Sequence, residues 1–523
     1  MTDPSGTGPL LSRSAIADRA GVERPAVTNW QRRYPDYPKP IRVGAEELFS
    51  AVEVHRWLST RVIPRSSLRP EEVHGTTFGD RFAAASRTDP DPALARRTID
   101  KLLLGKVGDR FGSVLMFSDY SMLLQELLHL RTDENAWKEL RQREHMLARL
   151  IDDLIARSPG GRNHRLSFLS HCPDQDLGYV IRLINELSPE QDVPLAFDIL
   201  LDRTAELHGR RGSEVFTPSS VREAMLAVLA QGPAPASLYD PYCRSGELLV
   251  DAAGLLKSGP TVHGATSRAG DARTSELNLA VHAVPASVLV DPRLPGVEVR
   301  HQYDMVLTNP PFGMRADGAP MSADRHWPFG VPTGWLDLAW VQHVVMSLSD
   351  SGRGAVVMPS GAAFRGGREQ EIRAALVESG AVECIVSLPG NLFASTGVPV
   401  TIWFLRSPRP NELEGILMID ATELGTRSAG RNSLDRAAVA AIASAYRSWH
   451  ADRRHTDISL HLDLEELRAT DYALLPTRYL STGPRPPTSE TSVDDLLRRL
   501  DALGSRAEQV DRELAKALKG WAR

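Results

Sequence analysis

Cysteines and long apolar runs are scarce in this sequence. Its 523 residues include three cysteines, Cys172, Cys243 and Cys384, which lie far apart without paired spacing. We therefore expect neither a disulfide framework nor a cysteine-based zinc site. No apolar run approaches the ~18 residues of a membrane-spanning helix, and the N-terminal residues lack the basic and apolar regions of a signal peptide. These absences predict a protein of the reducing cytoplasm, with no metal site and no membrane partner.

Positive charge is also limited. The formal net charge is -5, which excludes a uniformly basic surface for nucleic acid, so any DNA contact must be local. Hydrophobic residues make up 42% of the chain and charged residues 24%, which is the balance of a globular protein. At ~150 residues a domain, a chain of this length should contain several domains.

A local excess of positive charge lies near the N-terminus. The stretch from Arg13 to Arg65 has ten Lys or Arg residues against six Asp or Glu. Within it, "SAIADRAGVERPAVTNWQRR" predicts two short helices separated by a turn at Gly21, with Pro25 in the first turn of the second helix. The residues that follow, 34–58, resemble the wing and closing helix of winged helix-turn-helix domains of the MerR and excisionase type.

We expect residues 1–65 to form a winged helix-turn-helix domain that binds double-stranded DNA. Four polar or basic side chains of the second helix would face base edges or phosphates: Thr28, Asn29, Arg32 and Arg33. The alternative is a small helical packing domain that does not touch DNA. Residues 66–207 show apolar spacings of three and four, which predict a helical domain without a reactive motif.

After residue 208, short apolar strands alternate with helices. The strands include "SLYD", which ends at Asp240, "VHGA", "SVLVD" and "YDMVLT", which ends at Thr308. This alternation is typical of a doubly wound α/β sheet, in which ligands bind outside the carboxyl ends of the strands. The turn after Asp240, "PYCRSG", is neither a P-loop nor the G-x-G-x-x-G dinucleotide fingerprint. It therefore indicates a small-molecule ligand other than those that these two motifs bind.

The most specific motif is "LTNPPFG", Leu307–Gly313. Together with "SEVFTPSSV", "LYDPYCRSG", "LDLAWVQHVVMSL" and the block from "GRGAVVMPSG" to "VTIWFLR", it resembles the amino-group DNA methyltransferases that use S-adenosylmethionine. The resemblance is closest to the modification subunit of type I restriction-modification systems, and it runs from about Arg211 to Leu405. A lone motif of this kind occurs by chance in roughly a few per cent of chains of this size, whereas several blocks in the same order do not.

The resemblance implies a Rossmann-like methyltransferase domain with S-adenosylmethionine as its cofactor. The cofactor-binding residues that it implies are Phe216, Thr217, Asp240, Ser245, Gly246 and Asp291. Two positions depart from the family pattern. Arg244 stands where relatives usually have a glycine, which adopts positive φ more freely, and Thr266 stands where relatives usually have an acid for the ribose hydroxyls.

The resemblance places the catalytic loop at Asn309, Pro310, Pro311 and Phe312. The exocyclic amine of adenine is a poor nucleophile because its lone pair is delocalised into the ring. The side-chain oxygen of Asn309 and the carbonyl of Pro310 can accept the two amino hydrogens, which directs the lone pair at the sulfonium methyl. Pro310 and Pro311 stiffen the loop, and Phe312 offers a face on which a flipped base can stack.

Two functions stay open from the sequence: an active adenine-N6 DNA methyltransferase, or a degenerate methyltransferase fold retained as a DNA-binding or regulatory protein. The intact catalytic tetrapeptide favours the first, whereas Arg244 and Thr266 favour the second. Cytosine N4 and the glutamine amide present similar hydrogens, but Phe312 and the similarity to type I subunits favour adenine. No general base is required, since the methylated cation loses its proton readily to water, so we assign no catalytic histidine.

The C-terminal part comprises a mainly helical region, 411–483, and a linker with one long helix, 484–523. Apolar residues from Val493 to Trp521 follow steps of three and four over four heptads, a coiled-coil seam that needs a partner helix. In type I systems the modification subunit meets a specificity subunit through its tail, so the partner would be that subunit or a second copy of this chain. The alternative is a helix that folds back on the protein's own core. The predicted architecture is an α/β methyltransferase domain, 208–410, flanked by N-terminal and C-terminal helical regions.

Overall fold

The computed structural model describes residues 10–480 with gaps at 44–45, 65–66, 69–74, 86–89, 162–163, 208–215, 258–260, 294, 296–301, 316–326, 394–396, 411–414 and 429–430. Contacts divide the chain into two units. The first comprises Met1–Phe216, Tyr242–Gly254 and Thr261–Pro292, and the second comprises Thr217–Pro241, Leu255–Pro260 and Arg293–Arg523. The predicted coiled-coil helix lies outside the described residues, and the five sequence-based domains stay predictions.

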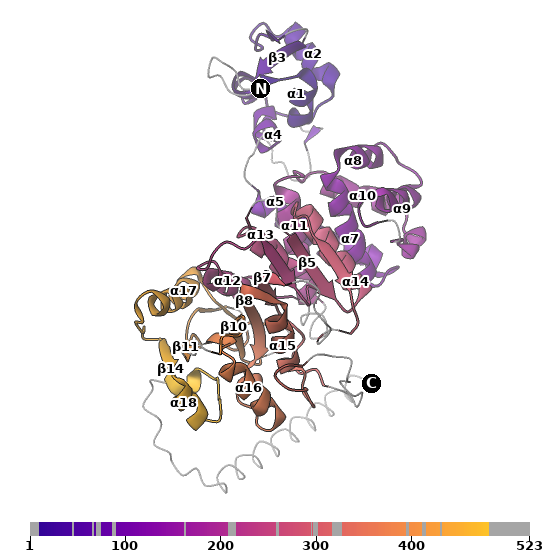
Figure 1. The fold of residues 1–523 in the computed structure, drawn as a ribbon. Helices are drawn as coiled ribbons and strands as arrows, with labels where there is room; N and C mark the ends of the chain where they lie inside the picture. The colour runs from indigo at the N-terminus through magenta and orange to yellow at the C-terminus, as the bar shows by residue number, and fades with distance from the viewer. Residues whose placement is uncertain are drawn as a thin grey trace, which may run out of the picture. The chain divides into compact units, whose positions relative to one another are not determined.

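The first unit begins with a small fold around two helices. Its elements are β1 (Leu10–Leu11), α1 (Arg13–Ala20), α2 (Arg24–Arg33), β2 (Ile41–Val43), β3 (Glu46–Ser50), α3 (Ala51–Leu58) and α4 (Phe78–Ala85) (Figure 1). The turn between α1 and α2 lies at Gly21, as the sequence predicts, with a φ of 63°. The strands pair antiparallel in the order β1-β3-β2. Ile16, Val27, Phe49 and Phe82 belong to a core that these elements share.

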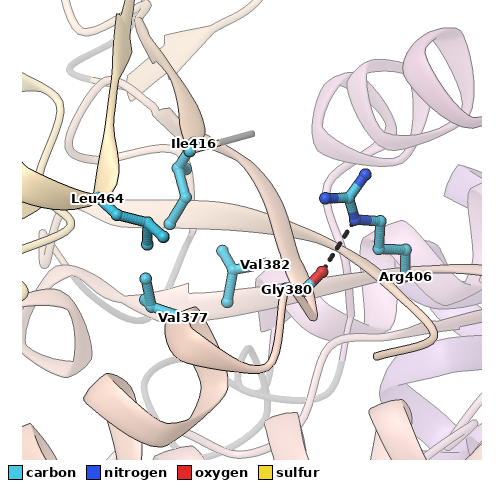
Figure 2. Close-up of a pocket in the computed structure, with 7 residues that line it drawn as sticks. Val377, Gly380, Val382, Arg406, Ile416 and Leu464 are labelled. Atoms are coloured by element: carbon cyan, nitrogen blue, oxygen red, sulfur yellow. Dashed lines mark hydrogen bonds between the residues drawn. The ribbon is translucent and has the colours of Figure 1, made fainter. Parts of the chain in front are cut away.

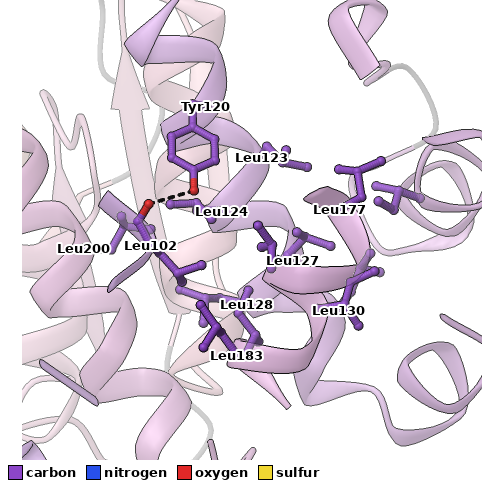
Figure 3. Close-up of a cluster of buried hydrophobic side chains, with 14 of the residues drawn as sticks. Leu102, Tyr120, Leu123, Leu124, Leu127, Leu128, Leu130, Leu177, Leu183 and Leu200 are labelled. Carbon is purple, nitrogen blue, oxygen red and sulfur yellow. Dashed lines mark hydrogen bonds between the residues drawn. The ribbon is translucent and has the colours of Figure 1, made fainter. Parts of the chain in front are cut away.

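A helical part follows in the first unit. Its elements are α5 (Pro92–Leu104), α6 (Lys106–Gly112), α7 (Phe117–Thr132), α8 (Glu134–Arg141), α9 (Leu147–Arg157), η2 (Ser167–His171), α10 (Asp174–Ile184) and α11 (Asp192–Leu207). Buried leucines of α7 meet leucines of the surrounding helices in Figure 3. The buried hydroxyl of Tyr120 donates to the carbonyl of Leu102 at 2.8 Å. Among the described helices none is long and apolar enough to cross a membrane.

Two helices and two parallel strands complete the first unit: α13 (Glu247–Ala253), β5 (Thr261–Thr266), α14 (Ala269–Val281) and β6 (Ser287–Val290). Helix α14 packs against α7. There the buried carboxylate of Glu126 accepts from Nε and Nη2 of Arg273, at 2.7 and 2.8 Å. This ion pair joins the helical part of the unit to its strand-bearing part.

Seven strands of the main sheet lie in the second unit: β4 (Ser237–Asp240), β7 (Tyr303–Thr308), β8 (Leu348–Pro359), β9 (Val382–Ser387), β10 (Val400–Arg406), β11 (Ile416–Asp420) and β14 (Ser459–Leu462). Their order is β14-β11-β9-β10-β8-β7-β4. Strands β4, β7 and β8 run parallel, and β10 lies antiparallel between β8 and β9. Side chains of β10 are buried on both faces from Val400 to Leu405, so both faces of this sheet must be covered.

Helices provide that cover. Figure 1 shows α12 (Ser219–Leu229) and α17 (Arg436–Asp452) to one side of these strands, and α15 (Asp337–Ser347) and α16 (Arg368–Glu378) to the other. The smaller elements are η4 (Ser360–Ala363), β12 (Thr426–Ser428), β13 (Arg431–Ser433), α18 (Leu464–Ala469) and α19 (Thr477–Leu480). Strand β14 is not predicted from sequence, because "SLHL" is short and half polar. The α/β class predicted for the chain is confirmed.

Candidate active site

Asn309 follows β7 directly and is almost fully buried, with 7% of its surface exposed. Its Nδ2 donates to Oγ1 of Thr217 at 3.1 Å, which fixes the orientation of the amide. Its Oδ1 is buried and has no hydrogen-bond partner among the described residues. A buried carbonyl without a donor costs about 1–3 kcal/mol, so a bound donor would stabilise this oxygen.

The residues after Asn309 form a short loop in the second unit. Pro310 is buried, and Pro311 and Phe312 are half-buried. The ring of Phe312 meets Phe393 edge to face, with centroids 5.5 Å apart and an interplanar angle of 77°. Phe393 therefore contacts one part of the Phe312 ring, and the half-buried ring keeps part of its surface exposed.

The loop closes at Gly313, whose φ of 67° lies in the left-handed region. Its N–H donates to Oδ1 of Asp337, the first residue of α15, at 3.1 Å. The other carboxylate oxygen of Asp337 accepts from Nη1 of Arg365 at 2.7 Å. Neither Asp337 nor Arg365 is predicted as a site residue from the sequence, although Asp337 is an acid in the block "LDLAWVQHVVMSL".

Two of the expected cofactor residues, Asp240 and Asp291, lie at the ends of strands β4 and β6. Asp240 ends β4 in the second unit and is buried. In the first unit, Gly246 has a φ of 76°, and a Cβ there would lie 2.7 Å from Oγ of Ser275. The carbonyl of Ser245 accepts from Nδ2 of Asn278 at 2.7 Å. A larger residue at position 246 would be strained by this φ and would press against Ser275 of α14.

The two departures from the family pattern are also in the first unit. Arg244 has a φ of 36°, and its guanidinium carbon lies 4.6 Å from the centroid of the Tyr242 ring. The loop therefore keeps a positive φ at this position with arginine instead of glycine. Thr266 is fully buried, and its carbonyl accepts from the N–H of Asp291 at 2.8 Å. Burial raises the pKa of Asp271, and Arg268 and Arg244 oppose that shift.

The remaining predicted residues are the pair expected to border the cofactor and the four expected to bind DNA. Phe216 packs against the helical core of the first unit, whereas Thr217 lies with Asn309 in the second. The four predicted DNA-binding residues are exposed on α2: Thr28, Asn29, Arg32 and Arg33. Their neighbour Gln31 instead accepts from Arg13 at 2.8 Å.

A pocket in the second unit contains none of the predicted site residues. It is lined by Val377, Gly380, Val382, Arg406, Gly415, Ile416 and Leu464 (Figure 2). Nε of Arg406 donates to the carbonyl of Gly380 at 2.8 Å, as Figure 2 shows. Among the residues that line this pocket, Arg406 is the only charged one, and it is already hydrogen-bonded. The candidate active site is therefore assigned to the loop at Asn309 and not to this pocket.

One family model matches more than half of the chain. Residues 190–485 match N-6 DNA Methylase. The methylase subunit of type I restriction enzyme HindI from Haemophilus influenzae is 26% identical over 349 residues, which are 62% of this chain and 77% of that protein. The MjaIX methylase subunit from Methanocaldococcus jannaschii is 25% identical over 340 residues, 60% of each chain.

Solved structures share the fold. The methyltransferase subunit of a type I restriction-modification system from Streptococcus thermophilus has a TM-score of 0.61 at 21% identity, over 75% of this chain and 100% of that one. A structure described as showing assembly and conformational transition of the type I system has a TM-score of 0.58 at 21% identity, over 80% of this chain and 99% of that one. At these identities the likeness establishes the fold.

Proposed function

The chain belongs to the N-6 DNA methylase family, and we propose that it transfers a methyl group from S-adenosylmethionine to the N6 amine of an adenine flipped out of double-stranded DNA. We further propose that it acts in the cytoplasm as the modification subunit of a type I-like restriction-modification system. The observation that carries the proposal is the buried Oδ1 of Asn309, which has no partner among the described residues. An adenine amine supplies the donor that this oxygen lacks.

The protein's part in the reaction is to position the amine. Oδ1 of Asn309 and the carbonyl of Pro310 accept the two amino hydrogens, so the nitrogen lone pair is no longer shared fully with the ring. With the cofactor bound, that lone pair would form the bond to the methyl carbon, the sulfur would keep the electrons of the broken S–C bond, and one amino proton would leave to water. Phe312 stacks on the flipped base and holds it against the loop. Bound S-adenosylmethionine supplies the electrophilic methyl group.

The residues present fit such a cofactor. Asp240 is a buried acid at the end of β4, and the loop to Gly246 keeps the positive φ values that let its backbone approach a ligand. Ser245, Gly246 and Asp291 would contact the cofactor together with Asp240, and Phe216 and Thr217 would border it. Arg244 lies over Tyr242, an arrangement that its positive φ permits.

The second candidate function is a degenerate methyltransferase fold that binds DNA or regulates without methyl transfer. The observation that favours it is Thr266, which is fully buried at the end of β5 where relatives usually carry an acid for the ribose. The two functions differ in cofactor affinity. Titration of the protein with S-adenosylmethionine, with and without duplex DNA, separates them: micromolar binding supports the enzyme, and no binding under either condition supports the degenerate fold.

DNA contact and partners complete the proposal. Exposed Arg32 and Arg33 on α2 would bind phosphates, in a winged helix-turn-helix domain of the MerR type, and Thr28 and Asn29 would lie at base edges. A specificity subunit, or a second copy of this chain, would pair with the predicted C-terminal coiled coil, whose residues lie outside the described part of the structure.

The decisive test replaces Asn309 by alanine in the host cell and maps N6-methyladenine by single-molecule sequencing of the genome. Asn309→Ala should abolish methylation at every site that depends on this gene, because the acceptor for the amine is gone. The matched control is Asn135→Ala, which removes an exposed asparagine of α8 and should leave methylation unchanged. Persistent methylation in Asn309→Ala would show that the loop is not catalytic.

A further inference from the structure

Asp337 is a buried carboxylate with two different donors. It is 1% exposed, and each of its oxygens accepts one bond, from the Gly313 N–H at 3.1 Å and from Arg365 Nη1 at 2.7 Å. It therefore joins three segments of the second unit: the end of the catalytic loop, the start of α15 and the segment after η4. A carboxylate suits this position because it can accept at both oxygens, whereas an amide has one oxygen and one NH₂ group.

The bond to Gly313 acts on the last residue of the loop. Gly313 has a φ of 67°, which glycine adopts without strain. Because glycine adopts other conformations as readily, a further contact is needed to keep the loop in this one. Because Asn309 is fixed at the other end by Thr217, the loop between them has two anchors. The direction of the Pro310 carbonyl and the face of Phe312 depend on both.

Arg365 secures the far side of the same carboxylate. It also binds Glu369 at 3.1 Å, and its guanidinium carbon lies 4.6 Å from the centroid of the Trp335 ring. Arg315, two residues after Gly313, lies over the same ring at 4.3 Å, and Arg315 and Trp335 form an isolated β-bridge. The segment that leaves the catalytic loop is thus packed onto the residues that hold Asp337.

We propose that Asp337 is a positioning residue for the target base: it fixes Gly313 and thereby sets the loop that receives the amine. The role rests on the proposed methyl transfer. It predicts that Asp337 affects the turnover of bound substrates and not the affinity for the cofactor, since its contacts lie in the second unit after β7.

The test compares two replacements of a carboxylate by an amide on the same arginine. In Asp337→Asn the single amide oxygen can accept from only one of the two donors, and Arg365 competes with Gly313 for it. The bond to Gly313 is therefore weakened, and kcat should fall about 10-fold to 100-fold, the range for loss of a charge-assisted hydrogen bond. In Glu369→Gln, Arg365 also loses one carboxylate partner, but Gly313 keeps its hydrogen bond to Asp337. Because the bond between Gly313 and Asp337 is left in place, kcat of this control should stay within about twofold of the wild type.

A second variant tests the mechanism of the loss. Adding Arg365→Met to Asp337→Asn removes the competing donor, so the amide oxygen can turn to Gly313, and kcat should rise above that of Asp337→Asn alone. Hydrogen exchange of the Gly313 amide gives a readout that needs no activity. It should quicken about tenfold or more in Asp337→Asn and not in Glu369→Gln.

The outcomes separate this inference from the proposed function. Unchanged turnover in Asp337→Asn, or unchanged exchange at Gly313, would refute the positioning role. A fall in turnover with an equal loss of cofactor affinity and of melting temperature would show a merely structural role and also refute it. A wild-type protein that transfers no methyl group in its native assembly would instead contradict the proposed function, and the exchange data would still decide whether Asp337 holds the loop.

Discussion

The ion pair between Glu126 and Arg273 gives the sharpest test of how the first unit is held together. Glu126 is fully buried and Arg273 is 4% exposed, and their two bonds are 2.7 and 2.8 Å long. Replacing Arg273 by methionine fills the space of the stem but leaves a buried carboxylate without its cation. Loss of one partner of such a pair costs about 3–5 kcal/mol, so Arg273→Met should lower the free energy of unfolding of this unit by that amount.

The compensating change decides whether charge is the cause. Replacing Glu126 by methionine as well removes the unpaired charge, and apolar replacement of a buried pair is often neutral or stabilising. We therefore expect the double variant to be more stable than Arg273→Met by at least ~2 kcal/mol. Urea unfolding, followed by hydrogen exchange of peptides from α7 and α14, measures both variants in the first unit alone. A double variant no more stable than the single one would refute the argument.

Three further predictions follow from other parts of the chain. Replacing Arg32 and Arg33 together by alanine should weaken duplex DNA binding and reduce the magnitude of its log–log salt slope by about 2, roughly one for each phosphate contact; an unchanged slope in fluorescence anisotropy would exclude α2 from the interface. Burial holds the pKa of His129 below its ordinary value of 6.5, so below that pH the unfolded chain binds more protons and stability should fall; His129→Gln should flatten this loss between pH 7 and 5.5 in thermal unfolding. Deleting the residues after Gly483 should lower the mass of any complex measured by light scattering, and an unchanged mass would remove the coiled-coil claim.

Sequence patterns predicted those features that depend on neighbouring residues. The turn at Gly21, the strand that ends before Asn309 and the loop that ends at Gly246 each carry a local signal in glycine, proline or alternating apolar residues. The bonds of Asp337 and Glu126 carry no such signal, because their partners are 24 and 147 residues away and a charged residue has the same local pattern whether paired or solvated. That Oδ1 of Asn309 has no hydrogen-bond partner in the described part of the chain is likewise a property of packing that composition cannot reveal.

The two candidate loops are built by the same device in different units. Each ends in a glycine at positive φ, Gly246 at 76° and Gly313 at 67°, and each is tied by a side chain of the helix that lies against it. In the first unit that helix is α14, whose Asn278 donates to the Ser245 carbonyl. In the second it is α15, whose Asp337 accepts from Gly313.

Because the two helices have separate anchors, their variants should affect different kinetic quantities. Arg273 lies on α14, so Arg273→Met should disturb the loop at Gly246 and raise the dissociation constant of S-adenosylmethionine, with a smaller change in kcat at saturation. Asp337→Asn should lower kcat and leave that dissociation constant unchanged. General destabilisation would move both quantities together in both variants. If each variant changes only its own quantity, the first unit sets cofactor affinity through α14, and the second sets the geometry of the target amine through Asp337.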